Sequence, residues 1–191
     1  VPVISIGNLT LGGTGKTPLV AWTARLLAAD GHRPAVISRG YGASPGHTSD
    51  EAAELALLVP GVTHVADRDR TAAARVAVAA GADCVVLDDG FQHRRLARDV
   101  DIVARGLLRE PLAGIARAHA IVLTRADAVA AARRREIRGL LDTARGGAAP
   151  VVWAEAEHSP VGLRRWTSAP LALETIRGRR VAPLAPIRNP A

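Results

Sequence analysis

Short apolar runs alternate with longer amphipathic segments along most of the chain. The apolar runs have the length of buried strands and occupy residues 1–6, 35–38, 62–66, 84–87, 100–103, 120–123 and 151–154. Segments with the apolar spacing of helices lie between them, at residues 15–29, 50–58, 70–80 and 128–144. Because strands that alternate with helices form parallel sheets, the pattern predicts an α/β fold with helices on both faces of a parallel sheet.

Two further features of the pattern concern the first helix and the end of the chain. The helix at residues 15–29 has an apolar face formed by Leu19, Trp22 and Leu26, with Val20, Ala24 and Leu27 beside them. The alternation weakens after about residue 167, although residues 181–184 suit one more strand. A glycine-rich stretch at residues 145–147 precedes the last clear strand. We therefore predict one domain at residues 1–148 and the start of a smaller C-terminal lobe at residues 149–191.

A glycine-rich loop joins the first predicted strand to the first helix. Its residues are Gly12, Gly13, Thr14, Gly15, Lys16 and Thr17. Backbone N–H groups of such a loop and of the helix N-terminus bind phosphate, the lysine reaches the β- and γ-phosphates, and the threonine hydroxyl binds Mg²⁺. The usual spacing of this P-loop places a glycine at residue 10, where the chain has Thr10. A plain glycine-rich turn is therefore the alternative.

The lysine of this loop is the only lysine in the chain. The sequence contains 25 Lys and Arg residues, and every one except Lys16 is arginine. A compact ammonium fits between phosphates in a tight loop, where a planar guanidinium does not. The retention of one lysine at this position favours phosphate binding.

The strand at residues 84–87 ends on the sequence Asp88-Asp89-Gly90. In P-loop enzymes, a carboxylate at the end of such a strand helps to hold Mg²⁺. The alternative is an ordinary Asp-Asp-Gly turn. The nearby P-loop favours the metal-organising function.

Three other candidates depend on weaker signals. His93 follows the Asp-Asp-Gly turn and is suited to contact a nucleotide or an acceptor, although an exposed turn histidine is the alternative. Asp50 begins a predicted helix and is suited to accept a proton, although acidic residues cap many helices. Arg109 is suited to stabilise a transferring phosphate, although alone it is a surface arginine. The loop at residues 124–127 lacks the Asn-Lys pair with which GTPases bind their base.

The composition indicates a globular protein with an anionic partner. The chain is 48% hydrophobic, its formal net charge is +7 and its pI is about 11.2. An arginine-rich solvated surface is the alternative explanation of this charge. A nucleic-acid partner is disfavoured because aromatic residues make up only 3% of the chain and no interleaved aromatic face is present. The single cysteine, Cys84, forms no internal disulfide, which suits a reducing compartment.

Taken in order, these residues resemble one known family. The matching blocks are residues 5–18, 38–42, 50–51, 87–94, 96–99, 107–111 and 178–181. They are similar to tetraacyldisaccharide 4'-kinase, the lipid A kinase, whose P-loop also has threonine at the position of Thr10. The resemblance covers nearly the whole chain, and the block Asp-Asp-Gly-Phe-Gln-His-Arg is its most specific part.

The resemblance implies a reaction and a set of roles. The reaction is phosphoryl transfer from ATP with Mg²⁺ to the 4'-hydroxyl of a lipid A disaccharide 1-phosphate, at the anionic cytoplasmic face of the bacterial inner membrane. It implies Asp50 as the base, Asp88 and Asp89 as organisers of Mg²⁺ and acceptor, and Gln92 and His93 beside them. Arg109 and Glu110 line the same site, with Glu110 joining Thr17 and Asp88 around the metal. Neither a nucleic acid nor an obligate protein partner is expected.

The chain departs from the family pattern at its ends and in two loops. The family's N-terminal membrane helix is absent, and the family's C-terminal segment supplies a histidine partner to the base. The loop between Gly42 and Asp50 and the segment between Val103 and Arg105 are shorter than in the family. We therefore expect a truncated chain. The alternatives are a nucleotide-binding fragment without turnover and another P-loop ATPase or GTPase.

Overall fold

The computed structural model describes residues 1–8, 10–11, 15–40, 50–93, 95–104, 107–108, 112–157, 159–160, 162–163 and 171–180. The strands of its main sheet are β1 (Val3–Asn8), β3 (Pro34–Ser38), β4 (Thr63–Ala66), β5 (Cys84–Asp88), β6 (Val100–Ala104), β8 (Ala120–Thr124) and β9 (Val152–Ala156). The α-helices are α1 (Lys16–Ala29), α2 (Asp50–Leu58), α3 (Arg70–Ala79) and α4 (Ala131–Arg145). The shorter elements are an antiparallel pair, β2 (Thr10–Leu11) and β7 (Leu107–Leu108), and three 3-10 helices, η1 (Leu112–Arg117), η2 (Ala126–Ala128) and η3 (Leu173–Ile176).

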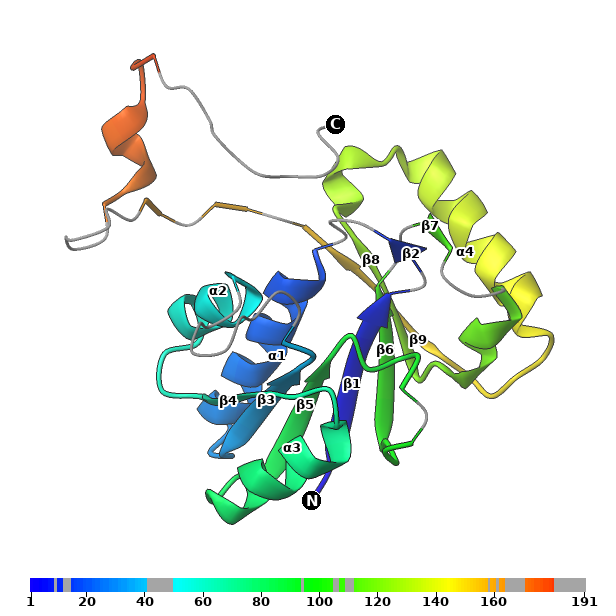
Figure 1. Ribbon diagram of the computed structural model, residues 1–191. Helices are drawn as coiled ribbons and strands as arrows, with labels where there is room; N and C mark the ends of the chain where they lie inside the picture. Colours follow the sequence, from blue (N-terminus) through cyan, green and yellow to red (C-terminus); the bar gives the residue numbers. More distant parts are fainter. Residues whose placement is uncertain are drawn as a thin grey trace.

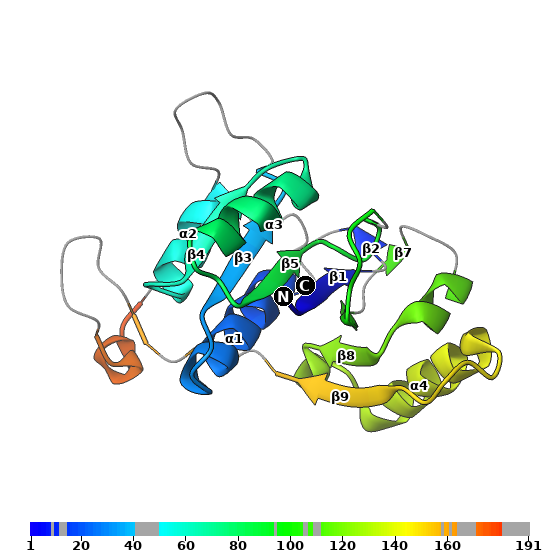
Figure 2. The same ribbon diagram turned by 90° about the horizontal axis from the view of Figure 1, so that it is seen from below.

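The seven strands form one parallel sheet in the order β4-β3-β5-β1-β6-β8-β9 (Figure 1). Helices cover both of its faces, α1 and α2 on one and α3 and α4 on the other (Figure 2). The predicted α/β fold is therefore confirmed. In the middle of the sheet, β1 pairs with β5 on one side and with β6 on the other. Because the strands are parallel, the segments that follow β1 and β5 leave the sheet at the same edge.

Alternate side chains of the central strands build separate cores on the two faces. Ile6, Val36 and Val86 pack under α1, together with Val20 and Ala24 of that helix. The opposite face is divided between a cluster under α3 and a cluster under α4. Strands that are buried on both faces read as continuous apolar runs, which explains why the sequence pattern located them.

The buried face of α1 is centred on the residues beside Leu19, Trp22 and Leu26, so the predicted apolar side of the helix is correct only in part. Val20, Ala21 and Ala24 are fully buried, whereas Trp22 is 56% and Leu26 is 53% exposed. Small residues allow α1 to lie close to the sheet, while Leu19 and Leu27 pack against the edge of the core and Trp22 and Leu26 turn away from it. Apolar spacing alone did not distinguish these two neighbouring faces of one helix.

Element boundaries also shift from the predicted ones. The first strand covers Val3–Asn8 instead of residues 1–6, and the last α-helix begins at Ala131, after the short helix η2. The strand predicted at residues 181–184 lies outside the described residues. The domain boundary between residues 148 and 149 stays a prediction. The strand that follows it, β9, pairs with β8 in the main sheet.

Gly7 allows the turn after β5 to cross β1 at very short range. A Cβ atom at Gly7 would lie 2.4 Å from Cβ and 2.9 Å from the backbone nitrogen of Phe91. Phe91 is fully buried and belongs to the core under α4. The absence of a side chain at residue 7 is therefore required for the turn to reach its position over the end of β1.

We expect Gly7→Ala to lower the free energy of unfolding by about 1–3 kcal/mol, because the new methyl overlaps backbone that has no room to move. Gly139→Ala is the matched control. Gly139 lies within α4 with open space at its Cβ position. The higher helix propensity of alanine should therefore raise the free energy of unfolding by about 0.5–1 kcal/mol. Urea denaturation of both variants measures the difference. Equal stabilities of the two variants would contradict the close approach at Gly7.

Candidate functional site

The start of α1 and the end of β5 meet at the carboxyl edge of the sheet. Gly15 has φ 73°, in the left-handed region that glycine adopts without strain, and α1 begins at the next residue. The Nζ atom of Lys16 lies 3.4 Å from Oδ1 of Asp88 and 3.1 Å from Oδ1 of Asp89. The structure thus brings together the predicted phosphate-binding lysine and both predicted metal-organising carboxylates. Residues 12–14 of the loop lie outside the described part of the chain.

The two carboxylates differ in their surroundings. Asp88 is the last residue of β5, and its side chain is 1% exposed, whereas that of Asp89 is 27% exposed. Asp89 has φ 55°, a left-handed conformation that non-glycine residues rarely adopt. Nη2 of the buried Arg70 donates a hydrogen bond of 3.0 Å to the main-chain oxygen of Asp88. This bond holds the carbonyl that precedes the strained residue.

The oxygen ligands near Lys16 suit a hard cation. Thr17 follows Lys16 in the first turn of α1, and a hydroxyl beside a carboxylate is a donor set that Mg²⁺ prefers. The described residues contain no group of three or more His, Cys, Asp or Glu side chains with metal-binding geometry. A site made of few protein ligands is usual for Mg²⁺, which also binds substrate phosphates and water.

The turn after β5 carries Gln92 and His93 into the same region. Nε2 of Gln92 donates a 2.8 Å hydrogen bond to the main-chain oxygen of Asn8, at the end of β1. The backbone N–H of His93 donates to the oxygen of Gly90 over 2.9 Å and closes the turn. Nε2 of His93 is buried and has no hydrogen-bond partner within the described residues. Burial lowers the pKa of this imidazole below its ordinary value, and the positive charges of nearby arginines lower it further.

The other predicted site residues are placed only in part. Asp50 begins α2, but its side chain lies outside the description. Arg109 and Glu110 also lie outside it, as does the side chain of Thr10. The backbone of Thr10 pairs with that of Leu108, so β7 brings the chain up to the start of the glycine loop immediately before Arg109. The predicted roles of these residues therefore stay predictions.

Arginines that support the turn were not predicted from the sequence. Arg70 binds the oxygen of Asp88, Arg98 binds that of His93, and Arg117 binds that of Phe91. One signal for Arg70 was available, because an arginine in the first turn of a helix is unfavourable for the helix dipole. Such a placement suggests that the side chain has another partner.

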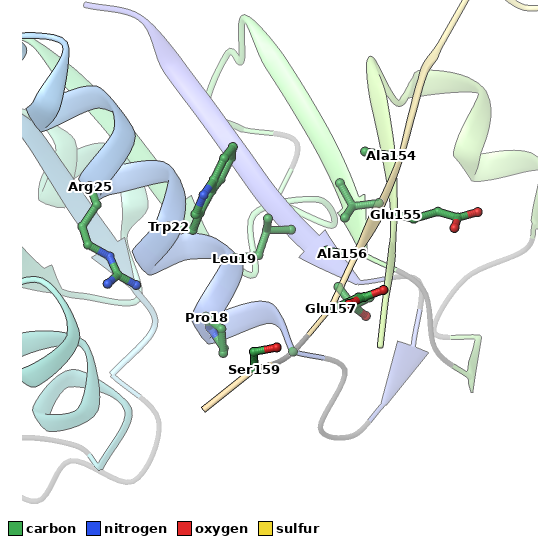
Figure 3. A pocket seen from close by; sticks show the side chains of 12 residues that line it. Pro18, Leu19, Trp22, Arg25, Ala154, Glu155, Ala156, Glu157 and Ser159 are labelled. Carbon is green, nitrogen blue, oxygen red and sulfur yellow. The ribbon is translucent and has the colours of Figure 1, made fainter. Parts of the chain in front are cut away.

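A pocket of about 580 Å³ lies beside the site, between α1 and the ends of β8 and β9 (Figure 3). Pro18, Leu19 and Trp22 line it from the helix, and Ala156 and Glu157 line it from the β9 side. Its walls also include Gly15 and Thr124. The pocket therefore begins at the last glycine of the glycine-rich loop and is of the size that small ligands occupy.

Membrane-spanning character is not found in the helices that the structure describes. None of them is long and apolar enough to cross a bilayer.

Comparison with known proteins gives a consistent assignment. A family model described as tetraacyldisaccharide-1-P 4'-kinase matches residues 1–191. The tetraacyldisaccharide 4'-kinases of Anaeromyxobacter dehalogenans and Geobacter metallireducens are 41% identical over 222 residues and 39% identical over 221 residues. These alignments cover 100% and 99% of this chain but 58% and 62% of those proteins. The chain thus spans about three fifths of the length of these curated relatives.

Solved structures agree with this result. LpxK from Aquifex aeolicus in complex with ATP has a TM-score of 0.59 and 38% identity, with 67% of this chain and 49% of that chain covered. A LAO/AO transport system kinase has a TM-score of 0.52 and 17% identity, with 82% of this chain and 53% of that chain covered. The second likeness shows the fold alone.

The lowered pKa of His93 predicts a pH dependence of stability. The folded protein binds a proton on His93 only at a lower pH than the unfolded chain does. The free energy of unfolding should therefore fall as the pH drops below the ordinary value of 6.5. His93→Gln should make the free energy of unfolding fall less on acidification. Some of the fall should remain, because burial also lowers the pKa of His64. Urea unfolding of both proteins between about pH 7.5 and about pH 5 measures this pH dependence of the free energy of unfolding. Parallel pH profiles of wild type and variant would contradict the prediction.

Proposed function

The chain belongs to the tetraacyldisaccharide-1-P 4'-kinase family, and on that premise we propose that it acts as an ATP-dependent kinase on the 4'-hydroxyl of a lipid A disaccharide 1-phosphate. The observation that carries the proposal is the contact of Lys16 with Asp88 and Asp89. The contact joins a phosphate-binding helix start to a pair of carboxylates at the edge of a parallel sheet. Phosphoryl transfer needs this combination, because it depends mainly on positioning and charge neutralisation.

On the nucleotide side, we assign phosphate binding to Lys16 and the loop before it. The Lys16 side chain is 13% exposed, so its ammonium is accessible to the β- and γ-phosphates of ATP. Thr17 and Asp88 would hold Mg²⁺, with Glu110 as the third candidate. The metal would neutralise charge on the phosphates when it is bound.

On the acceptor side, we assign proton acceptance to Asp50 and acceptor orientation to Asp89 and His93. Depression of the His93 pKa favours the neutral imidazole near pH 7, a form that can accept a hydrogen bond from a hydroxyl. Arg109 would stabilise charge on the transferring phosphate. These roles follow from the family resemblance and from the positions of the turn and of α2.

The acceptor and its location fit the charge of the chain. A disaccharide 1-phosphate is anionic, and a formal net charge of +7 attracts both such a substrate and an anionic membrane surface. We therefore propose that the protein works at the cytoplasmic face of the inner membrane.

We assign the pocket beside the site to the nucleoside part of ATP. Pro18 and Leu19 lie in the first turn of α1, so they are adjacent to the phosphate-binding residues and present apolar surface to a purine. Glu157 lines the pocket from the β9 side and supplies a carboxylate, which accepts hydrogen bonds from an exocyclic amine. A nucleotide would thus run from the glycine loop into the pocket between α1 and β9.

The proposed function is tested by phosphate transfer from labelled ATP to lipid A disaccharide 1-phosphate in the whole protein. We expect Lys16→Ala to lower kcat at least about 100-fold through loss of charge stabilisation, and Asp50→Ala to lower it about 100-fold or more through loss of the base. Asp30→Ala is the matched control, because Asp30 is exposed at the opposite end of α1.

The outcomes of this test separate the alternatives. Absence of transfer by the wild type would contradict the kinase assignment. ATP binding that Lys16→Ala abolishes, without transfer in any variant, would support a nucleotide-binding protein without turnover. Equal losses in Asp50→Ala and Asp30→Ala would contradict the assignment of Asp50 as the base.

The nucleoside pocket is tested by filling it. Ala156→Trp places a large ring between α1 and β9, and we expect it to weaken ATP binding at least about 10-fold. Val152→Trp is the same kind of change at an exposed position of the same strand, and it should leave the affinity within about twofold. Titration with a fluorescent ATP analogue gives both affinities. Unchanged binding by Ala156→Trp would place the nucleoside elsewhere.

A further inference from the structure

The block Leu96-Ala97-Arg98-Asp99 holds no proposed catalytic or binding residue, yet its Arg98 supports the turn that carries His93. Arg98 is largely buried, with a side chain that is 11% exposed. Its Nη1 atom donates a short hydrogen bond to the main-chain oxygen of His93. Its Nε atom donates to Oδ2 of Asp101 over 2.9 Å. One guanidinium therefore joins the turn to strand β6.

The partner of Arg98 is a fixed point of the sheet. Asp101 is 4% exposed and lies in β6, in register with Ser5 of β1. Its backbone N–H donates to Nδ1 of His119 over 3.0 Å, and its oxygen accepts from the backbone N–H of His119 over 2.9 Å. The carboxylate that holds Arg98 is thus attached to the centre of the fold.

We propose that Arg98, held by Asp101, is a positioning residue that fixes the turn from Asp88 to His93 and so presents His93 and Asp89 to the reacting groups. The inference rests on the proposed function, because it assigns the turn to a phosphoryl-transfer site. The planar guanidinium donates from two adjacent nitrogens to two fixed acceptors. A lysine ammonium at this position cannot reproduce that geometry.

Asp99 supplies a matched control in the same segment. Its Oδ2 accepts from the backbone N–H of Val3 over 2.8 Å, and its own N–H donates to the oxygen of Val3 over 2.9 Å. These contacts attach the segment to the beginning of β1, at the end of the strand away from the site. A substitution at Asp99 therefore loosens the same segment without touching the carbonyl of His93.

The test compares Arg98→Met, Arg98→Lys and Asp99→Ala in the whole protein, at a temperature where thermal unfolding shows each of them folded. We expect Arg98→Met to lower kcat between about 10-fold and about 100-fold, because a small displacement of the turn misaligns the reacting groups. The affinity for a fluorescent ATP analogue should change by less than about threefold. Asp99→Ala should keep kcat within about twofold.

Arg98→Lys keeps a cation beside the buried Asp101, so it provides the test if Arg98→Met does not fold. We expect it to lower kcat at least about threefold, because one ammonium does not hold both acceptors. Wild-type kcat in Arg98→Lys would overturn the proposal, as would equal losses of kcat in Arg98→Met and Asp99→Ala.

A second readout does not depend on turnover. The imidazole signals of His93 in an NMR spectrum should shift in Arg98→Met and stay unchanged in Asp99→Ala. Failure of the wild type to transfer phosphate would contradict the proposed function, and these signals would still test the positioning of His93. Unchanged signals in Arg98→Met would overturn the role of Arg98.

Discussion

The ion pairs between Lys16 and the two carboxylates at the end of β5 are the contact on which the arrangement of the site depends. Parallel pairing of β1 with β5 brings the start of α1 and the end of β5 to one edge of the sheet. A carboxylate as deeply buried as Asp88 is costly without a nearby positive charge, and Lys16 supplies one. The same contact couples the start of α1 to the turn that carries His93. Binding of an anion at the loop would therefore change the electrostatic interaction of Lys16 with the two carboxylates.

Local signals in the sequence predicted the fold and the centre of this site. The buried strands read as apolar runs because both faces of the sheet are covered, and the sequence before α1 has the glycines typical of a phosphate-binding loop. Lys16 stood out as the only lysine, and Asp88 stood out as an acidic residue at the end of an apolar strand. The uniqueness of Lys16 is read from the whole composition, and each of the other features is local in the sequence, so no knowledge of distant contacts was required.

The features that the sequence did not reveal depend on contacts between distant segments. The burial of Val20 and Ala24 in place of Trp22 and Leu26 follows from how closely α1 approaches the sheet, which helical spacing does not encode. The pocket forms because α1 meets β8 and β9, more than about 90 residues further along the chain. Likewise, the close approach of Phe91 to Gly7 joins two strand ends, and the sequence marks it only by a glycine within a strand.

The different bonding geometries of arginine and lysine explain the excess of arginine over lysine better than a solvated surface alone. Arg98 and Arg145 are largely buried and bind main-chain oxygens, Arg145 through two bonds to the oxygens of Ile115 and Ala118. Arg134 binds the main-chain oxygens of Ala126 and Val129, at the start of η2 and directly after it. A planar guanidinium with several donors can connect fixed acceptors of two segments and remain charged, so it suits permanent cross-links. The phosphate-binding role proposed for Lys16 is a different task, because its partners would change between the free and the nucleotide-bound protein. The ammonium of Lys16 is a compact point charge on a flexible stem, and it can leave the carboxylates for a phosphate without losing a planar, two-armed geometry. On this reasoning, the one lysine stands at the position where the cation must change partners.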